Sequence, residues 1–313
     1  MKTRTLGTNG PTLSVIGFGA WAIGGSWEFG WGPVDDGESI KAIRRALDLG
    51  INWIDTAAVY GLGHSEEVVA RALQGVRSRV FIATKCGMVW DEKGAVTKSL
   101  KPASIRNEME NSLRRLRTDY IDLYQFHWPD RETPVEESWK TMAELVREGK
   151  VRHIGVCNFS VCELERCLAV APVQSLQPPY NMLRRDAERE LLPFCGEHGI
   201  GVVACSPMAS GLLTGKFDFD ALAPDDWRRK SSQFNEDGRA RVTRLLNQLK
   251  PISERRGINL GELAVAWVLR NENITSAIVG ARREWQIEES AGAADLPLPI
   301  SDIGEIDISL KNF

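Results

Sequence analysis

The chain lacks several features that would point to a membrane or to nucleic acid. Its 313 residues contain no apolar run that approaches the roughly 18 residues of a membrane-spanning helix. There is no long run of lysine and arginine, and the formal net charge is −3. The N-terminal segment M-K-T-R-T-L-G has no apolar core of the kind found in secretory signal peptides. We therefore expect a cytoplasmic protein that has neither a membrane nor a nucleic acid as its partner.

Residues that form metal sites and disulfides are also few. The six cysteines, at positions 86, 157, 162, 167, 195 and 205, include no C-x-x-C pair, and we expect them to be reduced and buried. The four histidines, at positions 64, 127, 153 and 198, include no H-x-H pair. We therefore expect no metal site, and a zinc hydrolase is disfavoured.

What the chain does have is a regular alternation of strand-like and helix-like patterns. A β-hairpin with Asn9-Gly10 at its turn is expected at the N-terminus. Eight strands are then expected at 16–21, 51–55, 80–85, 120–127, 151–156, 174–177, 201–205 and 275–279. Helices are expected at 36–49, 65–74, 102–117, 134–148, 160–169, 184–198, 238–256, 260–270 and 283–292.

Eight strand–helix units in alternation predict parallel strands joined by right-handed crossovers. The strand number and even spacing favour one (β/α)8 TIM barrel domain over residues 1–313, and a doubly wound sheet is the alternative. The stretch 211–236, after the seventh strand, is longer than a plain connection needs. Ordered loops of this length are usually functional, so we expect it to act as a lid.

Ionisable side chains lie where successive strands end. Asp55 closes the second strand, Lys85 the third and His127 the fourth, while Tyr60 follows in the loop after Asp55. The carboxyl ends of barrel strands converge on one face, which is where barrel enzymes keep their chemistry. We therefore expect these four groups to meet in a proton-transfer site.

The four groups together suit carbonyl reduction. A lysine ammonium paired with Asp55 and close to Tyr60 is expected to lower the pKa of the phenol and make it a usable acid. The imidazole would orient the carbonyl that is being protonated. No side chain supplies a hydride, so a cofactor is required. An Asp–Lys pair could instead be purely structural, and a Schiff-base aldolase that uses Lys85 is disfavoured because Asp55 would keep the amine protonated.

Several segments resemble the aldo-keto reductase family. D-T-A-A-V-Y-G-L-G-H-S-E-E, A-T-K and Y-I-D-L-Y-Q-F-H-W-P-D match the segments that carry its catalytic Asp, Tyr, Lys and His, and V-R-H-I-G-V-C-N-F-S and S-P-M-A-S-G-L-L-T-G-K match further blocks. Within the superfamily the chain is most similar to bacterial general-stress and inositol-operon-type reductases, which are related to potassium-channel β-subunits. The resemblance implies a (β/α)8 barrel, NADP(H) and reduction of aldehydes or ketones. It makes Tyr60 the general acid.

The resemblance also implies which residues bind the cofactor. Asn158 and Gln177 would hold the nicotinamide, and the loop after the seventh strand would cross the pyrophosphate. Arg282 and Gln286 would face the 2′-phosphate, and Glu289 the adenine. The full set is Asn158, Gln177, Ser206, Met208, Gly211, Leu212, Lys216, Arg228, Gly280, Arg282, Gln286 and Glu289.

The chain departs from the family pattern at Cys157, Cys205 and Ser290, where Ser, an aromatic residue and Asn are common. These changes bear on cofactor affinity.

An apolar pocket beside Tyr60 is expected to be lined by Trp27, Trp31, Trp90 and Trp128, which favours carbonyl substrates with apolar or aromatic bulk. Trp21 is expected to cap the barrel core. A redox-sensing binding subunit with slow chemistry remains the alternative function. The physiological substrate, the preferred direction and the oligomeric state are left open.

Overall fold

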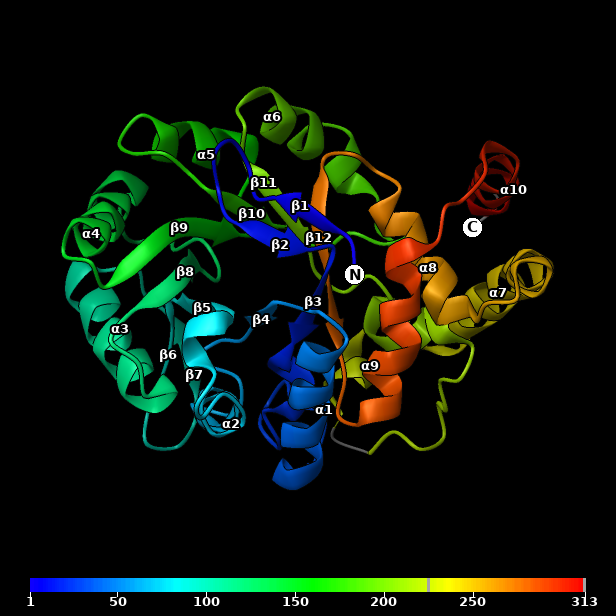
Figure 1. Ribbon diagram of the computed structural model, residues 1–313, viewed down its shortest axis with the longest axis horizontal. Coiled ribbons are helices and arrows are strands. Elements are labelled where there is room, and N and C mark those ends of the chain that lie inside the picture. The colour runs from blue at the N-terminus through cyan, green and yellow to red at the C-terminus, as the bar shows by residue number, and fades with distance from the viewer. Residues whose placement is uncertain (224–225, 312–313) are drawn as a thin grey trace.

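The computed structural model describes residues 1–223 and 226–311, so residues 224 and 225 of the expected lid lie outside the described residues. The predicted barrel of eight parallel strands is confirmed: the strands close in the order β10-β11-β12-β3-β4-β5-β8-β9 (Figure 1). They are β3 (Ile16–Gly19), β4 (Trp53–Asp55), β5 (Phe81–Cys86), β8 (Ile121–Phe126), β9 (Val151–Cys157), β10 (Ser175–Gln177), β11 (Gly201–Ala204) and β12 (Ile274–Gly280).

Helices surround this barrel, each with its apolar face turned inwards. Capping boxes fix two of the starts: Ser160 with Glu163 begins one helix, and Asn259 with Glu262 begins another. The helices that follow the strands are α1 (Asp36–Asp48), α2 (His64–Ala72), α3 (Pro102–Leu116), α4 (Val135–Arg147), α5 (Val161–Leu168), α6 (Leu191–Glu197), α8 (Leu260–Leu269) and α9 (Glu284–Ala291). Two more, α7 (Glu236–Arg256) and α10 (Ile300–Lys311), lie beside each other outside the ring (Figure 1).

The structure differs from the sequence-based expectation in a few elements. The first strand ends at Gly19, and the 3₁₀ helix η1 (Ala20–Ile23) replaces its last residues. The helix expected at 184–198 is shorter, because Pro193 fits only in a first helical turn and the helix begins at Leu191. The hairpin of β6 (Met88–Trp90) and β7 (Val96–Lys98) and the helix α10 were not predicted.

The expected N-terminal hairpin, formed by β1 (Thr3–Thr5) and β2 (Thr12–Ser14), lies across the N-terminal ends of the barrel strands (Figure 1). Leu6 and Leu13 are fully buried and pack on barrel-interior side chains that include Trp53. Burying each leucine contributes about 2 kcal/mol. The Trp53 indole N–H donates to the Ser14 carbonyl at 3.1 Å, so the hairpin closes this end of the barrel.

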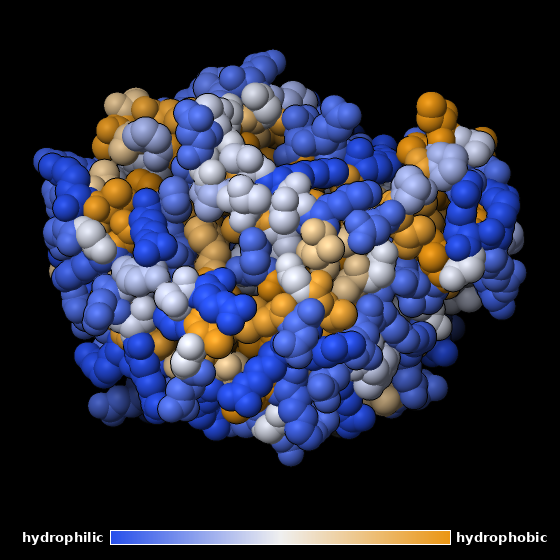
Figure 2. All heavy atoms as spheres, in the orientation of Figure 1, coloured by the Kyte–Doolittle hydropathy of each residue, from blue (hydrophilic) through white to orange (hydrophobic). Residues whose placement is uncertain are grey.

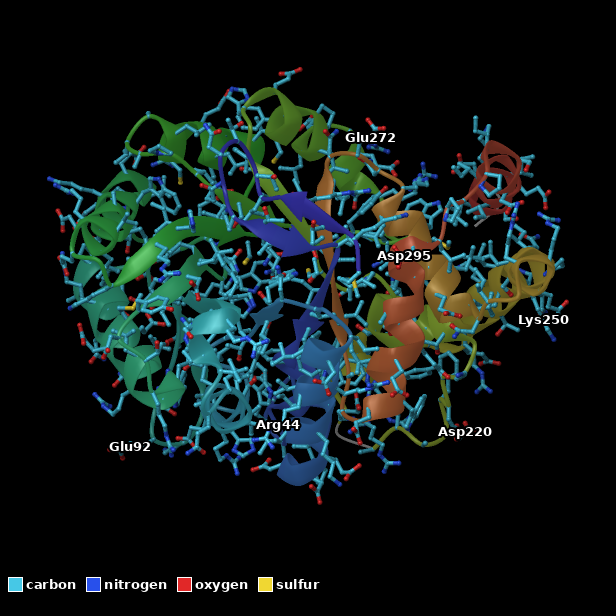
Figure 3. The ribbon with its side chains drawn as sticks, viewed as in Figure 1. Arg44, Glu92, Asp220, Lys250, Glu272 and Asp295 are labelled. Carbon is cyan, nitrogen blue, oxygen red and sulfur yellow. The ribbon has the colours of Figure 1, made fainter. Side chains whose placement is uncertain are left out.

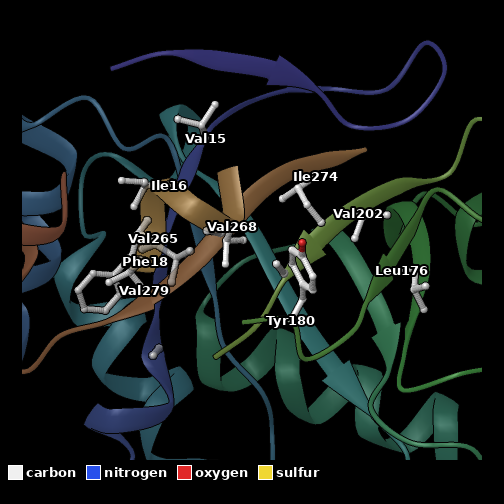
Figure 4. Close-up of a cluster of buried hydrophobic side chains, with 14 of the residues drawn as sticks. Val15, Ile16, Phe18, Leu176, Tyr180, Val202, Val265, Val268, Ile274 and Val279 are labelled. Carbon is white, nitrogen blue, oxygen red and sulfur yellow. The ribbon is translucent and has the colours of Figure 1, made fainter. Parts of the chain in front are cut away.

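The main apolar core lies between the barrel strands and the surrounding helices. Phe18 and Val279 from neighbouring strands pack there with Val265 and Val268 of α8 (Figure 4). The face that carries the hairpin is mostly hydrophilic with separate apolar patches (Figure 2), and charged side chains such as Lys250 lie at its rim (Figure 3). Within residues 1–223 and 226–311, no helix has both the length and the apolar character that crossing a membrane requires.

The prediction for the cysteines is partly wrong. All six are free, but Cys162 is exposed and Cys205 is only partly buried. Cys162 lies on the outer side of the first turn of α5, opposite Leu164 and Cys167, which face the core. No cluster of metal-binding side chains occurs in the part of the chain that the structure describes.

Candidate active site

The four ionisable side chains predicted from the strand ends meet at the C-terminal mouth of the barrel. The Lys85 ammonium donates to Asp55 Oδ2 at 2.6 Å, to the Thr56 carbonyl at 2.9 Å and to Tyr60 Oη at 3.2 Å. These three contacts use all three N–H donors of the lysine, which fixes the ammonium in place. The imidazole of His127 lies edge-on to the Tyr60 ring, with 5.6 Å between ring centroids.

A tight turn brings Tyr60 back over the barrel. Gly61, Leu62 and Gly63 all have positive φ angles, of 62°, 53° and 106°. A Cβ at Gly61 would lie 1.8 Å from the carbonyl oxygen of Gly24, so only glycine fits there. The sequence Y-G-L-G is therefore needed to place the phenol beside Lys85.

The expectation that Lys85 leaves Tyr60 with a lowered pKa is wrong in its net sign. Burial of the phenol, which is 8% exposed, raises its pKa well above the usual value, and the attraction of Lys85 offsets only part of this increase. Asp55 raises it further, because its carboxylate opposes a second negative charge nearby. Tyr60 is therefore fully protonated at neutral pH, which is the form that a proton donor needs.

The other two ionisable groups have defined charge states. Burial acts to lower the pKa of Lys85, but its attraction to Asp55 and Tyr60 outweighs burial, and the net pKa is raised. The lysine is therefore a stable cation, which argues against a Schiff base. Burial lowers the pKa of His127 well below its usual range, and Lys85 and Lys98 lower it further, so the imidazole is neutral.

A buried polar network supports the site from behind. Glu66, at the start of α2, is fully buried and accepts hydrogen bonds from Thr84 Oγ1 and Arg115 Nε, each at 2.6 Å. Thr84 precedes Lys85 on β5, and Arg115 packs against Gly63 at the end of the Tyr60 turn. The network therefore joins the strand that carries the lysine to the turn that carries the tyrosine.

The amides of Asn158 and Gln177 lie next to this group. Gln177 Nε2 donates to Asp55 Oδ1 at 2.7 Å, and Asn158 Nδ2 donates to the His127 carbonyl at 2.9 Å. Asn158 also has a positive φ of 61°, an unusual conformation that is typical of functional sites. The hydrogen bond to the His127 carbonyl orients the Asn158 amide. The neighbouring Cys157 thiol is buried, and burial raises its pKa.

A cleft of about 1640 Å³ runs from Tyr60 to the N-terminus of α9. It is lined by every residue expected to bind the cofactor except Leu212, whose side chain is 1% exposed and belongs to the core. The side chains of Cys205 and Ser290 also line it. The 3₁₀ helix η4 (Ala209–Thr214) turns the side chain of Leu212 inwards, and a cofactor contact from this residue stays a prediction.

The chain that follows β11 has a strained backbone along this cleft. Ser206, Ala209 and Ser210 have φ angles of 55°, 49° and 55°, and Gly211 has 96°. Non-glycine residues rarely adopt this left-handed conformation, and such strain is concentrated at ligand clamps. Successive backbone N–H groups in mixed left- and right-handed conformations form concave anion sites, which fits a loop that crosses a pyrophosphate.

The expected lid lies over the cleft and is tied to its walls. Lys216 Nζ lies 2.8 Å from Glu289 Oε1 of α9, so these two predicted cofactor residues pair with each other. Arg228, in the 3₁₀ helix η5 (Trp227–Lys230), pairs with Asp226 at 2.6 Å and lies 4.3 Å from the centroid of the Trp31 ring. These contacts hold the described part of the lid against the barrel.

Arg282 lies half-buried at the end of the cleft near α9. Its guanidinium donates to the Trp31 carbonyl at 3.2 Å. Burial lowers its pKa, and the nearby positive charges of Arg228 and Arg283 lower it further. A cation held beside like charges gains most from a bound anion. The side-chain carbonyl oxygen of Gln286 accepts hydrogen bonds from the backbone N–H groups of Arg282 and Arg283 and does not point outwards.

Aromatic side chains form the wall near Tyr60, but not quite the set that was predicted. Trp27, Trp31 and Trp128 line the cleft, whereas Trp90 does not. Trp90 packs against the small apolar cluster that contains Tyr60, with its ring centroid 5.9 Å from the Arg115 guanidinium, outside the cleft lining. Trp21 was expected to cap the core but lines the cleft, stacked on Tyr60 with a centroid distance of 6.3 Å.

Trp227 is a cleft residue that the sequence reasoning missed. Its ring stacks on Trp21 with 5.4 Å between centroids. Its place within the long loop at 211–236 was the available signal, since that loop was expected to cover the site. Which of its side chains would reach the aromatic wall depends on the path of the loop, which no sequence pattern specifies.

A parallel barrel with a Tyr–Lys–Asp–His group at its mouth and a long, arginine-lined cleft defines an oxidoreductase that works with a nicotinamide cofactor. The sequence profile of the Aldo/keto reductase family matches residues 15–311, and the chain belongs to this family.

Three relatives illustrate the sequence similarity between this chain and known members of the family. "Aldo-keto reductase YhdN" of Bacillus subtilis is 39% identical over 316 residues, which span 100% of this chain and 94% of the relative. "NADH-specific methylglyoxal reductase" of Escherichia coli is 38% identical over 317 residues, 96% of each protein. A "Probable voltage-gated potassium channel subunit beta" of Arabidopsis thaliana is 34% identical over 310 residues, 95% of this chain and 92% of the relative. The expected kinship with channel β-subunits is confirmed.

Solved structures agree with the fold. The glycerol dehydrogenase AKR11B4 from Gluconobacter oxydans superimposes with a TM-score of 0.90 at 39% identity, covering 99% of this chain and 95% of that one. The holo form of aldo-keto reductase AKR11C1 from Bacillus halodurans gives a TM-score of 0.81 at 29% identity, covering 99% and 96%. These likenesses extend over the whole barrel.

Proposed function

We propose that the protein is a cytoplasmic, NADPH-dependent reductase of aldehydes and ketones in which Tyr60 is the general acid. One observation carries the proposal: the buried Tyr60 phenol lies 3.2 Å from a lysine ammonium that Asp55 holds in place. A bound nicotinamide supplies the hydride for this chemistry. The cleft fits such a group, because it joins the phenol to the cationic end at Arg282 and passes the strained loop at 206–211.

The side chains of the protein would then carry out the proton transfer. Tyr60 Oη donates it to the carbonyl oxygen, and the adjacent Lys85 ammonium stabilises the phenolate that remains. Neutral His127 orients the carbonyl oxygen through a hydrogen bond. Asp55 keeps Lys85 charged, and Gln177 holds the second oxygen of Asp55. A proton donor placed in this way contributes about 10²- to 10⁴-fold in rate.

The preference for NADPH rests on Arg282. Its position beside Arg228 and Arg283 gives a cationic site that favours the 2′-phosphate, which NADH lacks. The E. coli relative is named as NADH-specific, so the preference requires its own test. We expect NADPH to bind more tightly than NADH, and Arg282→Ala to reduce that difference by about tenfold. If the ratio of the NADH and NADPH dissociation constants is the same in the variant and the wild type, Arg282 does not set the preference.

The proton-donor role is tested by Tyr60→Phe. Turnover of an aldehyde panel should fall by at least about 10²-fold, while NADPH binding, followed by cofactor fluorescence, should persist. Tyr120→Phe is the matched control, because Tyr120 immediately precedes β8 at the opposite end of the barrel. Retained turnover in Tyr60→Phe would refute the assignment.

A second candidate is a nicotinamide-binding redox sensor with slow chemistry. The similarity to the Arabidopsis protein named as a probable channel β-subunit favours it. Steady-state turnover on carbonyls and, in reverse, on alcohols separates the two, because an enzyme completes many cycles per minute. The alcohol arm also tests the oxidative direction that the name of the glycerol dehydrogenase suggests.

A further inference from the structure

The β6–β7 hairpin brings a lysine to the substrate end of the cleft. Met88 and Lys98 are cross-strand partners in this hairpin, and both line the cleft. Met88 and Val96 pack against the small apolar cluster that contains Tyr60. The hairpin is therefore anchored beside the proton donor, and Lys98 lies on its cleft-facing edge.

Lys98 is held by an aromatic ring and not by an acid. Its ammonium lies 4.6 Å from the centroid of the Trp128 ring, which is itself 37% exposed. Among residues 1–223 and 226–311, no carboxylate lies within ion-pair distance of Lys98. The other lysine and the lid arginine that line the cleft, Lys216 and Arg228, each pair with a carboxylate. Lys98 thus presents an unneutralised positive charge to the cleft.

The positive charge of Lys98 also acts on the catalytic group His127. The positive charges of Lys85 and Lys98 both act on His127, lowering its pKa. Lys85 is neutralised by Asp55 at 2.6 Å, whereas Lys98 has no carboxylate partner among the described residues. A ligand whose carbonyl contacts His127 therefore experiences the field of Lys98.

We propose that Lys98 and Trp128 form a subsite for a carboxylate carried by the carbonyl substrate, so that the preferred substrates are aldehydes or ketones with an aromatic or short apolar body and an acidic group. The proposal rests on the proposed function and deepens it. In the reaction the carbonyl carbon gains the hydride from NADPH, its oxygen gains the proton of Tyr60, and the products are the hydroxy acid and NADP⁺. The carboxylate itself is unchanged.

A matched pair of substrates tests the subsite. 4-Carboxybenzaldehyde and methyl 4-formylbenzoate share one ring and one aldehyde but differ in charge. We expect the wild type to favour the acid about tenfold in kcat/KM, mainly through KM, with the preference shrinking as salt is raised. Lys98→Met should abolish the preference while retaining turnover of the ester, and Lys98→Arg should keep it.

Lys93→Met is the control, because it removes the same charge from an exposed position of the same hairpin region outside the cleft lining. Its acid-to-ester ratio should match that of the wild type. If the wild type reduces the ester as efficiently as the acid, or if Lys98→Met keeps the preference, the subsite is overturned and the proposed reductase function stands. If the wild type reduces neither aldehyde nor any other carbonyl, the proposed function fails, and the subsite fails with it.

Discussion

Glu108 is a buried carboxyl group on the inner face of α3, behind the loop that follows β5. It is 6% exposed, and burial raises its pKa from 4.5 to about 7, although the Gly87 N–H and the Ser104 hydroxyl donate to it. A raised pKa in the fold means that the folded protein holds this proton more tightly than the unfolded chain. The stability that Glu108 contributes is therefore complete below pH 4.5 and is lost as the pH rises through about 7.

The size of the effect follows from the two pKa values. Each unit of pKa corresponds to about 1.4 kcal/mol, so the rise from 4.5 to about 7 corresponds to about 3 kcal/mol of unfolding free energy. Glu108→Gln keeps a carbonyl acceptor for Gly87 and cannot ionise. Relative to the wild type, the variant should therefore gain about 3 kcal/mol as the pH is raised, most of it between about pH 5 and pH 8.

Urea unfolding followed by tryptophan fluorescence at several pH values measures this difference. Glu92→Gln is the control, since Glu92 is an exposed glutamate in the turn between β6 and β7 (Figure 3). Its stability should follow that of the wild type at every pH. Parallel curves for Glu108→Gln and the wild type would refute the reasoning, because they would mean that Glu108 ionises in the fold as easily as in the unfolded chain.

Two further outcomes follow from charges in the site. Because the pKa of Tyr60 is raised and that of His127 is lowered, neither group titrates near neutrality, and kcat/KM for reduction should be flat from about pH 6 to pH 8; a limb centred near pH 6.5 in the profile would contradict the neutral imidazole. Glu66→Ala leaves Arg115 without its buried partner and should cost about 3 kcal/mol of unfolding free energy. Urea unfolding measures that loss, and a change near zero would show that the pair is not structurally important.

The barrel was predictable because its signals are local and repeated. Each strand pattern is followed by a helix pattern, and the positions of Asp55, Lys85 and His127 at strand ends place them on one face of the barrel. Parallel pairing then brings these ends together. The meeting of the tetrad needed only the topology and the short turn that carries Tyr60.

Other features depended on contacts between distant parts of the chain. The net pKa of Tyr60 could not be read from its sequence neighbours, because burial by residues far along the chain outweighs the attraction of Lys85. Trp21 lines the cleft instead of capping the core, because the 3₁₀ helix η1 carries it where a strand was expected, and Trp90 packs beside the Tyr60 cluster outside the cleft lining. Leu212 turned inwards because a 3₁₀ helix formed within a stretch that was expected to be only a loop.

The hairpin across the N-terminal ends of the strands has a kinetic consequence. Interior side chains such as Trp53 and Leu123 fill the barrel, and Leu6 and Leu13 cover its far end, so reactants share a single entrance at the mouth that carries Tyr60. Under the proposed function Gln177, at the end of β10, would hold the nicotinamide deep in the cleft, while the carbonyl compound would lie nearer the tryptophans at the entrance. The dinucleotide must then arrive before the carbonyl compound and leave after the alcohol, so product inhibition should follow a compulsory sequential order.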